Sequence, residues 1–468
     1  MDKANIGVIG LGAMGSNLAL NLSRNFNVSV YNRTYEKTRE LIKDYGKDKL
    51  VGYEHLPEFI NSLSLPRKVI IMVPAGAATD QVIDEIKLLL TVGDIIIDCG
   101  NSYYKDTNAR MLRLKNDGLN FVGCGVSGGE EGALHGPSLM PGCDLQIYNQ
   151  LENIFKTIAA KDFSSNACVT YIGENGAGHF VKMVHNGIEY SVMELISEIY
   201  DIYRSLYMLD SMQIAQIFEE YNLGKLNSYL IEITSKVLKQ KDEKTDDYLI
   251  NKILDRAGQK GTGKWTSIDS LDRDVALPSI TEAVFARVIS SDKETRLRLS
   301  KIYNKSLPQN LPSLDQFKEQ AQKALYCAQL SSYAQGYDLI QKAAISENWH
   351  INLSEISRIW EGGCIIRSQL LNLLHQAFAG IDINMHLFEI NIIVEEMESS
   401  KTYLRDVVSL ANLNGVAVPS LSTALSYFEM MTSQNLPANL IQGLRDYFGA
   451  HTYERNDMGG SFHTNWNQ

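Results

Sequence analysis

The chain has 468 residues, of which 44% are hydrophobic and 21% charged, and its formal net charge at pH 7 is −11. This composition is ordinary for globular domains and excludes a disordered or fibrous chain, while the length predicts two or three domains. An acidic surplus argues against nucleic-acid binding, which needs a basic face, but a few clustered cations are still able to bind a small anion.

The sequence also limits location and metal binding. No run of about 18 apolar residues is present, so we expect no membrane contact, and the start of the chain does not resemble a signal peptide. The six cysteines form no CxxC pair and have no zinc-finger spacing, which favours reduced thiols and a cytoplasmic location. No cluster of His, Asp and Glu has metal-ligand spacing, so we expect no metal site.

Residues 1–176 alternate between short apolar runs rich in β-formers and helix-like stretches. Most of these runs are continuously apolar, as expected for strands that are buried on both faces of a parallel sheet. The predicted strands are 6–10, 28–31, 68–73, 94–99 and 121–126. Strands that alternate with helices indicate βαβ units, so we predict an α/β Rossmann-like domain over residues 1–176.

The first predicted strand leads into the loop Gly10-Leu11-Gly12-Ala13-Met14-Gly15, which opens a helical pattern. In this context GxGxxG is typical of dinucleotide binding, because its glycines permit a tight turn and a close approach of backbone to a pyrophosphate. The alternative is an ordinary glycine turn.

The second strand ends at Asn32-Arg33-Thr34, where enzymes that use NAD usually carry a carboxylate for the ribose 2′-hydroxyl. The first carboxylate here is Glu36, whereas Arg33 offers a planar cation suited to a 2′-phosphate. The sequence therefore favours NADP. The alternative is that Arg33 is only a solvated loop residue.

Residues 177–434 have long stretches of 3.6-residue periodicity, such as 180–206 and 325–344, and no proline occurs from 142 to 277. We predict a large all-α domain. The motif Ile-Phe-Glu at 217–219 precedes Ser228, and the similar Ile-Trp-Glu at 359–361 precedes Ser368, which indicates either an internal duplication or a chance match.

Within that region, Lys182, His185, Asn186, Glu189 and Tyr190 recur at helical spacing and share one face of an otherwise apolar helix. Such a helix is expected to be buried, with its narrow polar face lining a cleft. Burial would lower the pKa of the lysine and raise that of the glutamate, which suits acid–base catalysis. The alternative is a structural ion pair.

Three further segments differ from plain loops. The turns at 126–129 and 258–265 are rich in glycine and suit an anion, although ordinary glycine turns are the alternative. Residues 435–468 are predicted to form a tail with a helix from Pro437 to Phe448. Because the aperiodic end at 449–468 is aromatic, we expect it to pack on something.

Five motifs together resemble the NADP-dependent, decarboxylating 6-phosphogluconate dehydrogenase family, over nearly the whole chain. They are IDCGNS (97–102), GVSGGEEGA (125–133), GAGHFVKMVHNGIEY (176–190), DRAGQKGTGKW (255–265) and RDYFGAHTY (445–453). The resemblance implies a Rossmann domain, a duplicated helical domain at 177–434 and a tail at 435–468 that enters the partner subunit of a homodimer.

The resemblance also implies residue roles, with Lys182 as general base and Glu189 as general acid. The implied substrate-binding residues are Asn101, Ser127, Gly128, Gly129, His185, Asn186, Tyr190, Lys260 and Arg287, with Arg445 and His451 from the other subunit. The implied cofactor-binding residues are Gly10, Leu11, Gly12, Ala13, Met14, Gly15, Asn32, Arg33, Thr34, Val73, Pro74, Ala75 and Asn101.

The implied reaction is oxidation of 6-phosphogluconate at C3 by NADP, loss of CO2 and protonation of the resulting enediol, which gives ribulose 5-phosphate. One departure is Pro74, where the family usually has lysine, so the affinity for NADP is expected to be altered. Two alternatives are a related β-hydroxyacid dehydrogenase for a non-phosphorylated substrate and a non-enzymatic NADP sensor. Lys260, Arg287 and Arg445 argue against the first, and the presence of Lys182 and Glu189 argues against the second.

Overall fold

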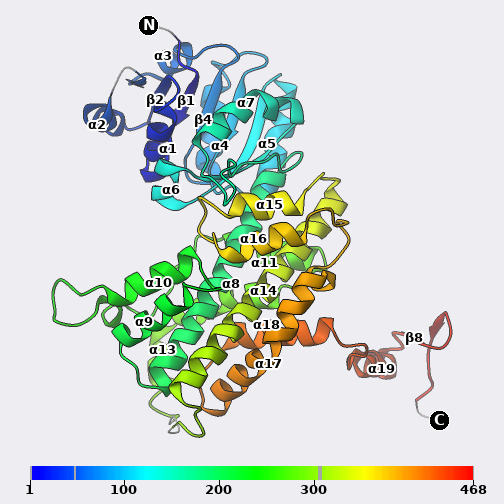
Figure 1. The fold of residues 1–468 in the computed structure, drawn as a ribbon. Helices are drawn as coiled ribbons and strands as arrows, with labels where there is room; N and C mark the ends of the chain where they lie inside the picture. The colour runs from blue at the N-terminus through cyan, green and yellow to red at the C-terminus, as the bar shows by residue number, and fades with distance from the viewer. Residues whose placement is uncertain (1–2, 47–48, 304–307, 467–468) are drawn as a thin grey trace.

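The computed structural model describes residues 3–46, 49–303 and 308–466. A sheet domain is followed by a larger helical domain, and a C-terminal segment extends away from both (Figure 1). The predicted fold class, with a Rossmann domain, an all-α domain and an extended tail, is confirmed. The outermost residues of the predicted domain limits, 1–2 and 467–468, lie outside the described residues.

The strands of the first domain form one seven-stranded sheet in the order β3-β2-β1-β4-β5-β6-β7, within the described residues. All neighbouring strands are parallel except β7, which is antiparallel to β6. The strands are β1 Ile6–Ile9, β2 Val28–Tyr31, β3 Leu50–Tyr53, β4 Lys68–Ile71, β5 Ile95–Asp98, β6 Asn120–Ser127 and β7 Ser138–Gly142. This order, with a reversal between β1 and β4, places ligands at the carboxyl ends of the strands.

Helices cover the sheet and bury an apolar cluster on each face, which explains why the predicted strands are continuously apolar. The helices are α1 Ala13–Ser23, α2 Tyr35–Tyr45, α3 Leu56–Asn61, α4 Ala77–Ile86, α5 Tyr104–Asn116, α6 Gly129–His135 and α7 Leu145–Ile158. The sequence did not indicate β3 or β7. β7 is an edge strand that contains Pro141 and Gly142, two residues that normally argue against a strand.

The helical domain is built on two long helices, α8 Ala177–Leu206 and α14 Leu314–Glu347, which pack against each other in one large apolar core. Shorter elements follow each of them. After α8 these are α9 Ser211–Tyr221, α10 Tyr229–Lys239, η1 Leu249–Asn251, α11 Thr262–Asp272, α12 Pro278–Ser291 and α13 Lys293–Leu299. After α14 these are α15 Leu353–Trp360, α16 Gln369–Ala377, η2 Leu387–Glu389, α17 Asn391–Leu413 and α18 Pro419–Met431.

The two similar motifs noted in the sequence lie in equivalent places, because each ends the helix that follows a long helix. The serines after them face each other, as Ser228 and Ser368 form an antiparallel bridge. The amide of Tyr229 donates to the carbonyl of Arg367, and that of Gln369 donates to Asn227 in return. The two motifs thus stand at equivalent places in the fold, and the internal duplication stays a prediction.

The tail begins with α19 Ala438–Gly449 and ends in a small hairpin of β8 Tyr453–Glu454 and β9 Ser461–Phe462. It projects from the helical domain (Figure 1). Its residues fold back on α19 through one buried carboxylate, since Asp446 is 0% exposed and accepts hydrogen bonds from Thr452, His463, Thr464 and Trp466.

Candidate active site

A cavity of about 630 Å³ lies where the sheet domain meets α8, a volume in the usual range for small-molecule sites. Its walls come from the ends of β5 and β6, from α8, from the loop before α11 and from α12. The residues that line the cavity and were expected to bind substrate or act in catalysis are Asn101, Ser127, Gly128, Gly129, Lys182, Asn186, Glu189, Tyr190, Lys260 and Arg287. Residues far apart in the chain thus converge on one space.

Lys182 is a buried lysine in the lining of this cavity. Its ammonium donates to Oδ1 of Asn186 at 2.7 Å and lies 3.3 Å from Nδ1 of His185. Only 7% of the residue is exposed, and this burial lowers the pKa of Lys182, an effect that the nearby Glu189 only partly offsets. The lysine is thereby brought closer to the neutral form that a general base requires.

His185 is 0% exposed and is not among the residues that line the cavity, although it was expected to bind substrate; its ring connects α8 to the end of β6. Its Nε2 is 3.3 Å from Oγ of Ser127, and its Nδ1 is 3.8 Å from Oε2 of Glu189. Burial, reinforced by the positive charge of Lys182, holds the pKa of His185 well below its ordinary value. The imidazole is therefore neutral and serves as a hydrogen-bonding group rather than as a charge.

Glu189 lies two helical turns after Lys182, with 19% of its side chain exposed. Burial raises the pKa of this carboxyl, and the charges of Lys182 and Arg287 oppose that rise. The Arg287 guanidinium stacks on the ring of Tyr190, 3.5 Å from its centroid, and donates to the carbonyl of Gly258 at 3.1 Å. Arg287 thus joins α12 to α8 and to the turn at 258–265, which carries Lys260.

Two turns at the carboxyl ends of strands complete the walls. After β6, Gly128 and Gly129 have φ angles of +130° and +63°, a conformation that other residues rarely adopt. After β5, the carboxylate of Asp98 accepts from the amide of Gly100 and from the hydroxyl of Ser102, and so fixes the turn that presents Asn101.

The loop Gly10–Gly15, which follows β1, borders a second cleft. A Cβ on Gly10 would lie 2.4 Å from the carbonyl oxygen of Met72, and one on Gly15 would lie 1.9 Å from that of Gly10. A Cβ on Gly12, in contrast, would meet nothing within 4 Å, so this glycine leaves room for a ligand. The amide of Leu11 donates to Oδ1 of Asn32, which ties the loop to the end of β2.

This second cleft has a volume of about 400 Å³ and includes Gly10, Gly12, Asn32, Arg33, Thr34, Val73 and Pro74. Of the other residues expected at the cofactor, Met14 and Asn101 line the first cavity instead. Within the loop, Leu11 and Gly15 are buried and Ala13 is exposed, and Ala75 is exposed in the turn after β4.

Sequence reasoning did not single out Lys37, which also lines this second cleft. The signal was weak, because Lys37 lies in the first turn of α2, whereas Arg33 precedes the N-cap Thr34 and shares no helix face with it. Sequence reasoning also did not single out Thr262, Met193 or Ile365, which line the first cavity. Ile365 follows α15 and had no local signal.

The tail residues Arg445 and His451 are not brought to this cavity within the chain. Both are exposed, on or just after α19, and the tail extends away from the domain that carries Lys182 (Figure 1). Among the described residues, no group of three or more His, Cys, Asp and Glu is arranged to hold a metal ion.

A dinucleotide-binding sheet domain, joined to a helical domain that supplies a buried Lys–Glu pair, defines a dehydrogenase of the nicotinamide-dependent class. Comparison with known families narrows this class. The model for the NAD binding domain of 6-phosphogluconate dehydrogenase matches residues 5–173, and that for the C-terminal domain of the same enzyme matches residues 178–466. The chain belongs to the 6-phosphogluconate dehydrogenase family.

Individual relatives agree with this assignment. The chain is 48% identical to the decarboxylating 6-phosphogluconate dehydrogenase of Lactococcus lactis subsp. cremoris, over 100% of this chain and 99% of the relative. It is also 48% identical to the NADP(+)-dependent, decarboxylating enzyme of Bacillus subtilis, over 100% of both. The solved structure of Plasmodium falciparum 6-phosphogluconate dehydrogenase, studied with its cofactor NADP+ and its substrate 6-phosphogluconate, superposes with a TM-score of 0.95 at 43% identity, covering 99% of this chain and 100% of that one.

Proposed function

We propose that the two clefts serve one reaction, the NADP-dependent oxidative decarboxylation of 6-phosphogluconate to ribulose 5-phosphate and CO2. The observation that carries the assignment is the shared cavity of Lys182 and Glu189, bordered by the cations Lys260 and Arg287. A proton-transfer pair fits the chemistry at the sugar carbons, and the cations fit a phosphorylated acid.

NADP fits the cleft beside the glycine-rich loop. The open space at Gly12 admits a pyrophosphate, while Arg33 and Lys37 supply positive charge for the 2′-phosphate at the end of β2. Lys37 also offers a cation in a cleft where Pro74 stands in place of the family's lysine. When bound, NADP accepts the hydride from C3 of the sugar acid.

Lys182 acts as the general base in the oxidation. Its lowered pKa favours the neutral amine, which takes the proton of the 3-hydroxyl as C3 is oxidised. The product is a 3-keto acid whose ketone is β to the carboxylate. The ammonium of Lys182 then stabilises the negative charge that develops on the oxygen of this ketone while CO2 leaves.

Glu189 acts as the general acid in the last step. Its raised pKa favours the protonated carboxyl, which donates a proton to C1 of the enediol and gives the ketose phosphate. Ser127, His185 and Asn186 hold the sugar acid between these two groups.

We further propose a homodimer in which Arg445 and His451 of the partner subunit complete the phosphate site. Two features support it. The tail projects from its own chain (Figure 1), and large apolar side chains are exposed on α12, α18 and α19, a typical mark of an interaction surface. They are Phe285, Val288, Ile289, Met430, Met431, Leu440, Ile441, Leu444 and Phe448.

The enzyme is proposed to act in the cytoplasm. In the described residues, no helix combines the length and apolarity needed to span a membrane. Support for the location comes from the six cysteines, which are all buried and unpaired, as is usual for a chain kept in a reducing compartment.

The reaction is tested by supplying 6-phosphogluconate with NADP and following both the near-ultraviolet absorbance of the reduced nicotinamide and the release of CO2. We expect the two products in equal amounts from the wild-type chain and neither from Lys182→Met. Reduction of nicotinamide without CO2 release would indicate a simple hydroxyacid dehydrogenase instead.

A further inference from the structure

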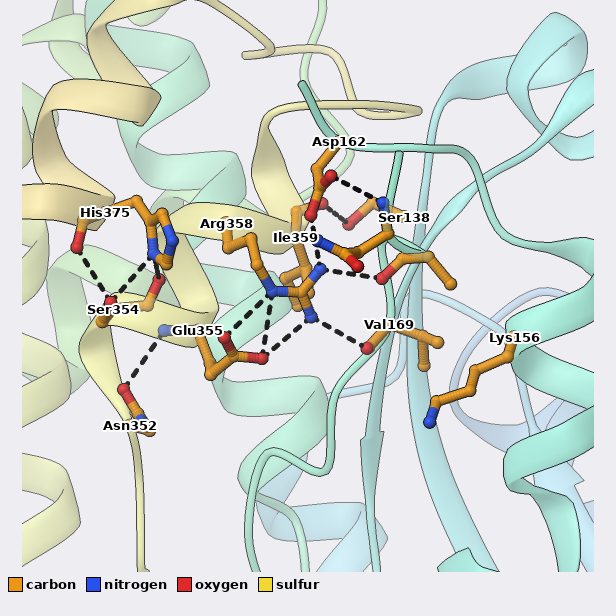
Figure 2. Close-up of polar contacts among 12 residues, drawn as sticks. Ser138, Lys156, Asp162, Val169, Asn352, Ser354, Glu355, Arg358, Ile359 and His375 are labelled. Atoms are coloured by element: carbon orange, nitrogen blue, oxygen red, sulfur yellow. Dashed lines mark hydrogen bonds and ion pairs between the residues drawn. The ribbon is translucent and has the colours of Figure 1, made fainter. Parts of the chain in front are cut away.

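The end of α15 lies against the sheet domain, where Arg358 meets Asp162 and Val169 and Ile359 meets Ser138 (Figure 2). We propose that this segment, residues 358–363, positions the loop Ser127–Gly129 and the ring of His185, and that Arg358 is its anchoring residue. The inference rests on the proposed function, because it assigns positioning residues to the substrate site defined there.

Arg358 anchors the segment through its guanidinium, and only 13% of its side chain is exposed. Its Nε and Nη2 donate to the carboxylate of Glu355 in the same helix, at 2.8 to 3.1 Å. Its Nη1 donates to Oδ2 of Asp162 and to the carbonyl of Ala167, both at 2.9 Å, and Nη2 reaches the carbonyl of Val169 at 3.3 Å. The planar fork therefore binds α15 to three residues that follow α7.

The acceptor on the sheet domain is itself rigidly held. The Asp162 side chain is 1% exposed, and its Oδ1 accepts from the amides of Ser164 and Asn166 at 2.9 and 2.8 Å. A second contact runs beside it, where Oε2 of Glu361 accepts from the amide of Phe163 at 3.1 Å. Breaking a buried pair of this kind leaves an uncompensated charge, so the anchor has no easy alternative arrangement.

From the anchor, backbone contacts lead directly to the substrate loop. The carbonyl of Gly363 accepts from the amide of Ser138 at 3.0 Å, and Oγ of Ser138 donates to the carbonyl of Ile359 at 2.7 Å. Ser138 is the register partner of Ser127 in the antiparallel pair of β6 and β7. Ser138, which is hydrogen-bonded to the segment, therefore lies directly opposite Ser127, a residue proposed to bind substrate.

The turn at Gly363 also touches the loop without any side chain between them. A Cβ on Gly128 would lie 2.4 Å from the carbonyl oxygen of Gly363. Gly363 itself has φ +66°, and a Cβ there would lie 2.5 Å from both Ala160 and the carbonyl oxygen of Gly136. Because backbone packs on backbone, a shift of Gly363 is transmitted to Gly128.

The same segment supports His185. The indole of Trp360, which is 0% exposed, meets the imidazole edge-on with ring centroids 5.4 Å apart. Trp360 is held in turn by its Nε1–H, which donates to Sδ of Met140 at 3.4 Å. Both supports of the sugar acid, the loop at Ser127 and the ring of His185, therefore depend on the position of α15.

The test replaces Arg358 by lysine, which keeps the charge but loses the fork. Displacement of the loop by about 1 Å is expected to raise the KM for 6-phosphogluconate roughly tenfold or more. The KM for NADP should stay unchanged, because the cleft at Gly12 does not touch the segment. A purely structural defect would reduce the amount of active enzyme without raising this KM.

Arg67→Lys is the matched control. Arg67 binds Asp94 at 2.9 Å with side-chain exposures of 11% and 1%, against 2.9 Å, 13% and 1% for Arg358 and Asp162. Its pair lies at the amino ends of β4 and β5, opposite the site. This variant should lower thermal stability while leaving both KM values unchanged.

A milder variant, Ser138→Ala, decides the matter if Arg358→Lys does not fold, since it removes only the bond to Ile359. It is expected to raise the same KM by a smaller factor. Unchanged KM values for 6-phosphogluconate in the folded variants would overturn the positioning role. Failure of the wild-type chain to turn over 6-phosphogluconate with NADP would instead overturn the proposed function.

Discussion

Burial brings the pKa values of Lys182 and Glu189 closer together, because it lowers the pKa of the amine and raises that of the carboxyl. Each of the two charges also acts on the pKa of the other group, so their titrations are linked. The productive form carries one proton, with a neutral amine ready to accept and a protonated carboxyl ready to donate. This arrangement leads to a definite pH profile.

We expect a bell-shaped dependence of kcat/KM on pH for the wild-type enzyme. Activity falls on the acid side as Lys182 becomes an ammonium, and on the alkaline side as Glu189 loses its proton. Glu189→Gln should keep the acid limb, lose the alkaline limb and slow the protonation of the enediol more than the oxidation. An alkaline limb that persists in this variant, or full activity at saturating substrate, would withdraw Glu189 as the acid.

Cofactor choice is a second property that we expect single residues to decide. Loss of a charge-assisted contact to the 2′-phosphate costs about 1.5–3 kcal/mol, so Arg33→Ala should raise the KM for NADP by about tenfold or more. The KM for NAD, which lacks this phosphate, should hardly change. Lys37→Ala serves as a comparison within the same cleft. An equal loss with both cofactors would show that Arg33 does not read the phosphate.

At the scale of elements, α8 agrees closely with its sequence pattern. Its polar residues recur every three or four positions, so any helix over this stretch must bring them to one side. The positions of β3 and β7 were harder to anticipate. β7 is an edge strand whose Pro141 and Gly142 conflict with local β propensity, and it is held by its pairing with β6 and by bridges to Val169 and Gly173.

The tail depends on Asp446 for its shape. Burial alone would raise the pKa of this carboxyl, but the hydrogen bonds from His463, Thr464, Trp466 and Thr452 hold the pKa at about 2, so it is ionised under working conditions. Asp446→Ala should make the segment after α19 sensitive to proteolysis. If the tail completes a partner's site, the KM for 6-phosphogluconate should rise as well.

The control for this variant is Asp457→Ala. Asp457 also lies in the tail, but it forms an exposed pair with Arg455, with side-chain exposures of 42% for the arginine and 53% for the aspartate, and such pairs contribute little to stability. Its removal should alter neither proteolysis nor KM. Equal behaviour of the two variants would mean that Asp446 does not organise the tail.

For the whole molecule, the proposed exchange of tails makes activity a property of the dimer. Lys182→Met with an intact tail, and Arg445→Ala plus His451→Ala with an intact lysine, should each be inactive. In a mixed dimer, one of the two sites receives wild-type residues from both chains. Co-expression should therefore restore activity at one site per heterodimer. A mixture that forms heterodimers yet stays inactive would contradict the shared site.

The features that could be predicted from the sequence are local. The glycine-rich loop, Arg33 after β2 and the polar face of α8 are set by spacing along one strand, turn or helix, and each was predicted from neighbouring residues. The tertiary structure decided which distant segments support them. Arg358 and Asp162 are 196 residues apart, and nothing near either predicts their pairing. Such contacts follow from how the helical domain docks on the sheet, which depends on the shapes of both surfaces together.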